Sequence, residues 1–341
     1  MTDDMRMRLL AYYISAFSAR QDVSISPLSS LSTGWETEVY AFEVEYGPAE
    51  ARTGESLILR IYPGDDAHAK ATHEYHSLRQ LHQAGYPVPQ VLALECDDSF
   101  FGRPFVIMER VKGCEMWPLL FGSTRDAEAQ QTLLTLFCQL FVRLHSLDGR
   151  LFDATLDTAD SYTCVDRWLS VARNNLARFP RLDFVPLLKW LEARRDELPC
   201  SRPAPVHGDF HPSNILLRDD GSPVVIDWTG FGVSDSRFDL AWTLLLANAY
   251  LGAEWRDHIL HEYERQGGTR VEHIESFEVF ACARRLFDLY VSLVAGAEKQ
   301  GMRPGAVAMM KQQMGAHMRV YDLMRERTGI RIGEIERLFA Q

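Results

Sequence analysis

The stretch HGDFHPSNILL, His207–Leu217, concentrates the polar chemistry of this 341-residue chain. It holds two histidines, an aspartate, a serine and an asparagine within eleven residues, and then turns apolar. Asp209 stands five residues before Asn214, and Asp227 follows at the end of a second apolar run, PVVI. RDDG lies between NILL and that run, so we expect a hairpin that returns the chain toward the loop.

One interpretation of the stretch is a metal hydrolase site. His207, Asp209 and His211 stand at alternate positions and could converge on a metal if the segment were a strand. The glycine and proline between them favour a loop instead, and no second His/Asp cluster in the sequence supplies further ligands. This hypothesis is therefore the less favoured one.

Phosphoryl transfer fits the spacing better. Kinase catalytic loops use an aspartate as base, an asparagine five residues later as a metal ligand and a further aspartate that binds Mg²⁺. Asp209, Asn214 and Asp227 reproduce this series. Phosphoryl transfer asks the protein for a carboxylate that accepts the hydroxyl proton and for oxygen ligands to a hard cation. The three residues together predict this chemistry.

The composition limits the remaining classes. With 46% hydrophobic and 24% charged residues the chain is typical of a globular protein, and no apolar run is long enough for a membrane span. A net charge of −11 argues against nucleic acid as partner and is compatible with a cationic substrate. The six scattered cysteines predict free thiols. The N-terminus lacks the pattern of a secretory signal, so we expect a cytoplasmic protein that does not bind membranes.

The pattern along the chain predicts an α+β fold with two lobes. Residues 37–46 and ESLILRIYP alternate as a hairpin, residues 66–84 have helical spacing, and PVPQVLALEC and PFVIMERV follow as strands. From Gly113 onward amphipathic helices dominate. We therefore expect a small β-rich N-terminal lobe over residues 1–111 and a larger, mainly helical C-terminal lobe over residues 112–341.

Glu74 is the most informative charged residue of the first part. It shares the apolar face of its predicted helix, being three residues after Ala71 and four before Leu78. A carboxylate on such a face is costly unless it is paired. Arg60, in the second strand, is the obvious partner, so the sequence predicts an Arg60–Glu74 ion pair.

These motifs, in this order, resemble those of the aminoglycoside phosphotransferase family and, more broadly, the protein-kinase-like fold. The resemblance extends over about residues 31–268. The segments that carry it are VHGDFHPSNILL, VVIDWTGFGVSDSRFDLAW, STGWETEVYAFEV, LILRIYP, HEYHSLRQLHQAGYPVPQVL and FVIMERVKG.

The resemblance implies roles for individual residues. Asp209 is then the catalytic base, Asn214 and Asp227 bind Mg²⁺, and His207 and Asp239 support the loop. The other implied roles all concern the nucleotide, which is ATP, with GTP open as an alternative. Arg60 contacts phosphate and pairs with Glu74, and Gly34 and Thr37 lie in the phosphate loop. Glu109 and Val111 bind adenine through their backbones. An arginine in place of the usual lysine and a loop with a single glycine depart from the family pattern.

Several alternatives remain open at this stage. A protein kinase would need a long regulatory segment ending in A-P-E, whereas twelve positions separate Asp227 from Asp239 and no such motif follows. A small-molecule hydroxyl acceptor is therefore preferred. By family it is aminoglycoside-like, with sugars, amino alcohols and macrolides as alternatives. A catalytically silent nucleotide-binding pseudokinase is the rival of a different class. We expect a monomer or a homodimer.

Overall fold

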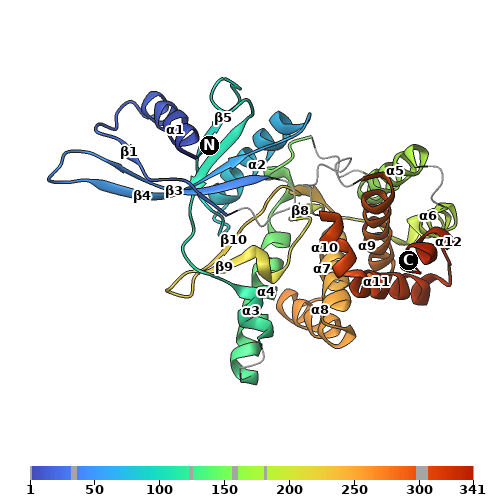
Figure 1. The fold of residues 1–341 in the computed structure, drawn as a ribbon. Coiled ribbons are helices and arrows are strands. Elements are labelled where there is room, and N and C mark those ends of the chain that lie inside the picture. The colour runs from blue at the N-terminus through green and yellow to red at the C-terminus, as the bar shows by residue number, and fades with distance from the viewer. Residues whose placement is uncertain are drawn as a thin grey trace. The chain divides into compact units, whose positions relative to one another are not determined.

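The computed structural model describes residues 2–31, 37–122, 126–155, 160–179, 183–296 and 306–340. The chain forms two compact units (Figure 1). One consists mainly of Met1–Cys114 and Leu216–Thr229, and the other of Glu115–Ile215, Gly230–Gln300 and Pro304–Gln341. The predicted division at residue 111 lies close to the first of these boundaries. Leu216–Thr229, which the prediction gave to the C-terminal lobe, packs with the first unit instead.

The first unit is built on an antiparallel sheet of six strands. Their order is β1-β3-β4-β6-β5, with β2 also paired to β3. The bounds are β1 Ser24–Ile25, β2 Ser29–Ser30, β3 Glu38–Tyr46, β4 Thr53–Ile61, β5 Val91–Glu95 and β6 Phe105–Glu109. The predicted hairpin is present as β3 and β4, whose register pairs Val39 with Arg60.

Helices α1 and α2 pack against this sheet. Helix α1 (Thr2–Ala16) buries Leu9, Tyr12 and Tyr13 in a core with Phe42 and Leu59 of the sheet. Helix α2 (Ala67–Gln83) follows β4, as predicted, and buries its apolar face together with one carboxylate, that of Glu74. The sequence did not identify α1 as part of the core.

The hairpin predicted downstream of the polar loop is also present. Strand β9 (Ile215–Leu217) pairs with β10 (Pro223–Val225), and β7 (Cys114–Glu115) pairs with β9 on its other side. The backbone N–H of Val225 also donates to the carbonyl of Pro87 (2.8 Å). The end of β10 is thereby fixed within the first unit, and Asp227 lies two residues beyond it.

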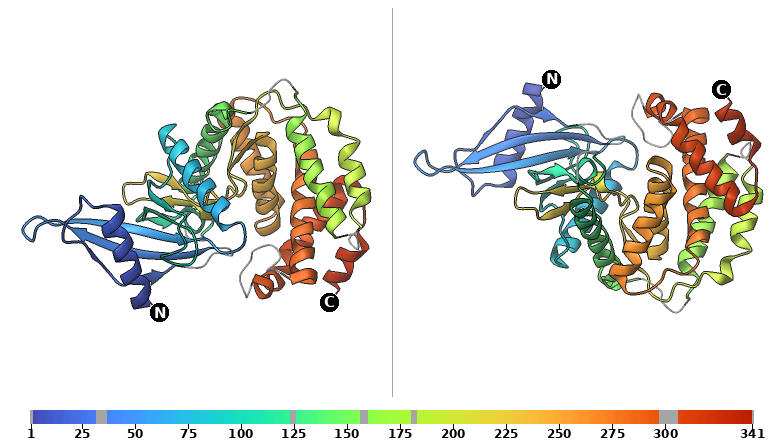
Figure 2. Two further views of the ribbon diagram at one scale, coloured as in Figure 1. Left: turned by 90° about the horizontal axis from the view of Figure 1, so that it is seen from above. Right: turned by 90° about the horizontal axis from the view of Figure 1, so that it is seen from below.

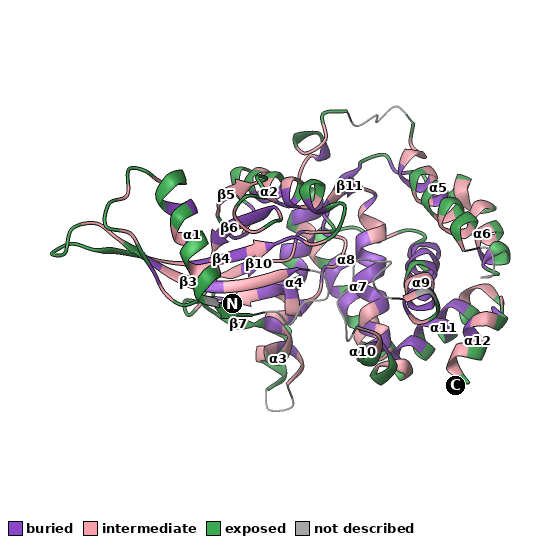
Figure 3. Ribbon diagram, turned by 45° about the horizontal axis from the view of Figure 1, so that its top comes forward, coloured by how far each residue is buried: buried purple, intermediate pink, exposed green. Residues whose placement is uncertain are grey.

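The second unit is mainly helical (Figure 2). Its helices are α3 Met116–Phe121, α4 Ala127–Ser146, α5 Thr163–Arg178, α6 Val185–Glu192, α7 Ser236–Tyr250, α8 Ala253–Gly267, α9 Ile274–Tyr290, α10 Ala306–Gln312, α11 Met314–Thr328 and α12 Gly333–Phe339. Helices α7 and α9 form its buried centre (Figure 3). Strand β8 (Ala204–Val206) pairs antiparallel with β11 (Gly232–Ser234). No helix in the described part of the chain is long and apolar enough to cross a membrane.

Candidate active site

The polar loop of the second unit begins where β8 ends, at His207. Gly208 has φ +84°, in the left-handed region that favours glycine. A Cβ at this position would lie 2.7 Å from the carbonyl oxygen of Gly230, just before β11. Glycine is therefore required here by both backbone conformation and space, and the close approach fixes the direction in which the chain leaves the strand.

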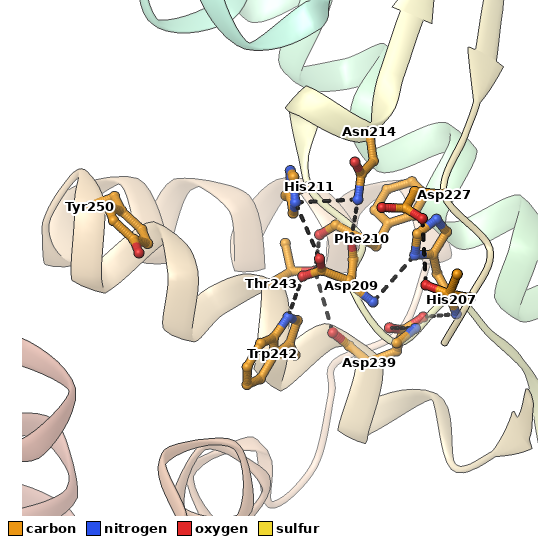
Figure 4. Close-up of polar contacts among 12 residues, drawn as sticks. His207, Asp209, Phe210, His211, Asn214, Asp227, Asp239, Trp242, Thr243 and Tyr250 are labelled. Atoms are coloured by element: carbon orange, nitrogen blue, oxygen red, sulfur yellow. Dashed lines mark hydrogen bonds and ion pairs between the residues drawn. The ribbon is translucent and has the colours of Figure 1, made fainter. Parts of the chain in front are cut away.

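Asp239, in the first turn of α7, holds this loop by its backbone. Its carboxylate accepts hydrogen bonds from the N–H groups of His207 (2.6 Å) and Gly208 (2.8 Å) (Figure 4). The Nε2 of His145 on α4 lies 3.3 Å from the same carboxylate, and the Tyr263 hydroxyl lies 2.7 Å from His145 Nδ1. Burial opposes ionisation of Asp239, but the bonds from His145 and His207 outweigh it and lower the pKa of Asp239.

Asp209 presents a half-exposed carboxylate from the loop. Its Oδ1 accepts a hydrogen bond from the indole Nε1 of Trp242 on α7 (2.7 Å), and the Nε2 of His211 lies 3.5 Å from its Oδ2. Burial raises the pKa of Asp209, but the bonds to His211 and Trp242 outweigh it and hold that pKa well below its usual range. The carboxylate is therefore ionised at neutral pH.

Asn214 closes the loop onto Asp209. Its Nδ2 donates to the backbone carbonyl of Asp209 (2.9 Å) and lies 3.2 Å from His211 Nε2. Among the described residues no hydrogen bond reaches its Oδ1, so this oxygen is available to a cation. The spacing of five residues thus has a local structural reason, because the asparagine amide bridges back to the carbonyl of the aspartate.

The segment between Asp209 and Asn214 is anchored by aromatic packing. Phe210 is fully buried and stacks on Phe141 of α4, with ring centroids 4.1 Å apart. The hydroxyl of Thr243 donates to the Phe210 carbonyl (2.6 Å). These contacts fix the backbone on the C-terminal side of Asp209, as Asp239 fixes it on the N-terminal side.

A second polar cluster lies in the first unit and centres on Arg60. The predicted ion pair with Glu74 is confirmed, with Arg60 Nη1 3.0 Å from Glu74 Oε1. The other amino group, Nη2, lies 3.1 Å from Oδ1 of Asp227, so the guanidinium joins two carboxylates. The Tyr62 hydroxyl donates to Glu74. The sequence predicted the first of these contacts and missed the other two.

Burial gives this cluster its electrostatic character. The Glu74 side chain is 1% exposed, and burial raises the pKa of its carboxyl although Arg60 lowers it in part. Burial also acts to lower the pKa of Arg60, but the charge of Glu74 outweighs it, so that this pKa is raised and the arginine stays charged. Arg60 Nε is buried and has no hydrogen-bond partner among the described residues.

Asp227 adopts an unusual backbone conformation. Its φ is +66°, in the left-handed region that non-glycine residues seldom adopt, although aspartate does so more readily than most. The next residue, Trp228, is fully buried, donates from Nε1 to the Val225 carbonyl (2.9 Å) and packs edge-on to Tyr86. The buried indole anchors the turn while the Asp227 carboxylate stays half-exposed.

Oxygen atoms of the kind that Mg²⁺ takes are present on Asn214 in the second unit and on Asp227 in the first. Asn214 offers an amide oxygen and Asp227 a half-exposed carboxylate, and Mg²⁺ takes such oxygen ligands while keeping several waters. Across the described ranges no group of three or more His, Cys, Asp and Glu side chains is arranged to hold a metal. The triad His207, Asp209 and His211 therefore gives no support to the metal hydrolase hypothesis. The N–H of Asp209 in fact donates to His207 Nδ1 (3.2 Å).

Three of the four residues predicted to bind adenine or to lie in the phosphate loop, Glu109, Val111 and Thr37, lie in the described part of the chain. At the end of β6, Glu109 pairs with Arg218 (2.6 Å), and its N–H donates to the Gln90 carbonyl. Its side chain is therefore structural. In the described part of the chain no hydrogen bond engages the Val111 N–H, so this group can donate to a ring nitrogen of adenine. Thr37 is buried. Gly34 lies outside the described residues.

Removing the buried counter-charge of Arg60 gives a stability prediction. We expect Glu74→Gln to lower the free energy of unfolding by about 3 kcal/mol, the low end for a broken buried ion pair, because Asp227 still contacts Arg60. Urea unfolding measures the loss. The matched control is Glu192→Gln, which breaks the exposed Arg173–Glu192 pair and should cost less than about 1 kcal/mol. Equal losses in the two variants would contradict the buried pairing.

Comparisons with known proteins identify the family and support the fold. The sequence model of the phosphotransferase enzyme family matches residues 27–276. A protein of Ralstonia eutropha assigned as an aminoglycoside phosphotransferase superposes with a TM-score of 0.66 at 17% identity, over 94% of this chain and 98% of the other. An aminoglycoside phosphotransferase bound to GDP and kanamycin superposes with a TM-score of 0.58 at 16% identity, over 95% of this chain and 99% of the other. The ternary complex of APH(4)-Ia with ADP and hygromycin B superposes with a TM-score of 0.53 at 17% identity, over 92% of this chain and 97% of the other.

Two curated relatives share sequence over about half of the chain. Acyl-CoA dehydrogenase family member 10 of Mus musculus is 31% identical over 206 residues, which are 55% of this chain and 18% of the mouse protein. Family member 11 of Gallus gallus is 30% identical over 200 residues, 53% of this chain and 24% of the chicken protein. The chain thus matches less than a quarter of the length of either relative.

Proposed function

Because this chain belongs to the phosphotransferase enzyme family, we propose that it transfers the γ-phosphoryl group of Mg·ATP to a hydroxyl group of a small molecule. The family and the protein-kinase-like fold support nucleotide-dependent phosphoryl transfer to an alcohol. The observation that carries the detailed proposal is the carboxylate of Asp209. It is ionised, half-exposed and oriented by Trp242, on a loop whose backbone is fixed on both sides.

Asp209 is the proposed base. Its low pKa keeps the carboxylate ready to accept a proton, and it orients the acceptor hydroxyl until the new P–O bond makes that proton acidic. A loose phosphoryl-transfer transition state needs little more from a base than this. His207 and Asp239 act as positioning residues, since they contact the loop and not the reacting atoms.

The remaining roles concern the nucleotide. We propose Asn214 and Asp227 as oxygen ligands of Mg²⁺, which when bound neutralises charge on the phosphates. Arg60, held by Glu74, contacts phosphate, and the backbones of Glu109 and Val111 bind adenine. Thr37 and Gly34 are proposed for the phosphate loop, and GTP remains an alternative to ATP. The division into a nucleotide-binding part, 1–111, and a catalytic and acceptor part, 112–341, is part of the same proposal.

A screen of hydroxyl compounds tests the function. Purified protein is given Mg·ATP and a panel of aminoglycosides, sugars, amino alcohols, macrolides and simple alcohols, and ADP formation is followed. Acceleration by a compound, with a phosphorylated product in the mass spectrum, supports phosphoryl transfer. If Mg·ATP binds and no compound accelerates ADP formation, the protein is a catalytically silent nucleotide-binding pseudokinase instead.

Replacing Asp227 tests the metal ligands. We expect Asp227→Asn to weaken Mg²⁺-dependent ATP binding and turnover together, by roughly tenfold or more, because a charged oxygen ligand is lost. Calorimetric ATP titrations at several Mg²⁺ concentrations measure the change. Thr229→Val is the matched control, since Thr229 lies in the same turn, offers no carboxylate, and its hydroxyl donates only a long hydrogen bond (3.4 Å) to Asp227 Oδ1. An unchanged Mg²⁺ dependence in Asp227→Asn would remove Asp227 from the ligand set.

A further inference from the structure

A cavity of about 360 Å³ lies within the second unit, among α5, α6 and α9. We call it the helix pocket. Figures 2 and 3 show these three helices side by side. Its volume lies within the usual range for small-molecule sites, about 300–1,000 Å³. At about 30 Å³ for each water-sized group it holds on the order of a dozen non-hydrogen atoms.

The lining of the helix pocket is apolar. Of its thirteen lining residues ten are aliphatic or aromatic, among them Leu188 and Phe287, and the polar ones are Asn175, Arg284 and Asp288. One arginine and one aspartate cancel in charge. A polycation would need an excess of carboxylates to replace its hydration. The pocket offers none, although the chain as a whole carries a net charge of −11.

Arg284 connects the helix pocket with the catalytic loop. It lines the pocket, and its Nη1 donates to the carbonyl of Gly208 (3.1 Å), the residue before Asp209. Its guanidinium also lies over the ring of Trp242, 4.1 Å from the centroid. The indole of Trp242 is the donor to the Asp209 carboxylate. A single side chain therefore borders the pocket and contacts both the loop and the residue that orients the proposed base.

We infer that the acceptor is an alcohol whose hydroxyl is carried on an uncharged apolar body, and that the helix pocket binds this body. The inference rests on the proposed phosphotransferase function and narrows its acceptor away from polycationic aminoglycosides. In the reaction the alcohol oxygen forms a bond to the γ-phosphorus, and the bond from that phosphorus to the β,γ-bridging oxygen breaks. The alcohol proton passes to Asp209, and ADP leaves.

Transfer to a homologous series tests the acceptor class. Straight-chain primary alcohols of increasing length are compared with kanamycin as acceptors for Mg·ATP. We expect kcat/KM to rise about fourfold for each added methylene, the value for burying one such group, until the pocket is full. Kanamycin should be a poor acceptor. A flat dependence on chain length, or kanamycin as the better acceptor, would overturn the inference.

Binding of 1-octanol without nucleotide separates this inference from the proposed function. Ala172→Phe fills the pocket, whereas Ser170→Phe places the same ring on an exposed position of the same helix outside it. We expect calorimetry to show octanol binding to the wild type and to Ser170→Phe, and at least tenfold weaker binding to Ala172→Phe. Such binding without transfer to any alcohol supports the pocket and refutes the function. Transfer to kanamycin without octanol binding refutes the pocket and supports the function, and absence of both refutes both.

Discussion

Replacement of Asp209 by asparagine is expected to lower kcat about 10²- to 10⁴-fold, the usual contribution of a general base. The amide is nearly isosteric with the carboxylate and can still accept from Trp242, so the loop should keep its conformation. The affinity for Mg·ATP should be unchanged, because Asp209 in its proposed role acts on the acceptor. Steady-state ADP formation measures the first effect, and calorimetric ATP titration the second.

A more conservative change nearby serves as the comparison. Trp242→Phe keeps an aromatic face beneath Arg284 and removes the donor to Asp209. Loss of one hydrogen bond to a charged group should lower kcat about tenfold, corresponding to roughly 1.5 kcal/mol. Because this bond lowers the pKa of Asp209, the acidic limb of the pH–rate profile of Trp242→Phe should move to higher pH.

If Asp209→Asn instead lost ATP binding and kept its turnover per bound nucleotide, Asp209 would not be the base.

Removal of the Asp239 carboxylate is expected to cause the largest loss of stability. Asp239→Ala leaves the N–H groups of His207 and Gly208 without their acceptor, and it removes the carboxylate beside His145 Nε2 while Nδ1 keeps its contact with Tyr263. Each buried donor left unsatisfied costs about 1–3 kcal/mol, so the total should reach about 3–5 kcal/mol. Urea unfolding at neutral pH measures it. A loss below about 1 kcal/mol would show that the loop does not depend on this carboxylate.

The contacts of Asp239 also predict how the difference in unfolding free energy between the wild type and Asp239→Ala varies with pH. The pKa of Asp239 is lower in the folded protein than the value of about 3.9 in an unfolded chain. Its contribution is therefore fully present above about pH 5 and is lost as the pH falls through the folded pKa. The gap in unfolding free energy between wild type and Asp239→Ala should be constant from neutral pH to about pH 5. It should then shrink at lower pH.

Much of the fold could be predicted because its signals are local. The alternation of β3 and β4, the apolar face of α2 and the turn residues between β9 and β10 are each visible within a short window of sequence. Helix α1 was missed because its side chains Leu9, Tyr12 and Tyr13 are buried only by packing against the sheet, which a short window of sequence does not reveal. The placement of Leu216–Thr229 with the first unit was missed for the same reason, since its partner Pro87 is far away in sequence.

The candidate site shows a similar division. Arg60–Glu74 was predicted because an unpaired carboxylate on an apolar helix face demands a counter-charge, which is a local argument. His145, Trp242 and Tyr263 were missed because each lies in a helix without a recognisable motif, and its role depends on a contact with a distant segment. His145 and Asp239 are 94 residues apart. His145 stands among buried apolar residues in the last turn of α4, and such a polar residue on a buried face was a signal that could have been followed.

The fork of Arg60 has a consequence for how ligands act on one another. The guanidinium of Arg60 contacts Glu74 on α2 and also Oδ1 of Asp227. A metal cation that binds this Oδ1 must therefore compete with the positive charge of Arg60. An anion that draws Arg60 toward itself relieves this competition. Thermodynamic reciprocity then requires each to raise the affinity for the other by the same factor. In the proposed function, the two amino groups of the Arg60 fork would therefore couple the binding of nucleotide to the binding of magnesium.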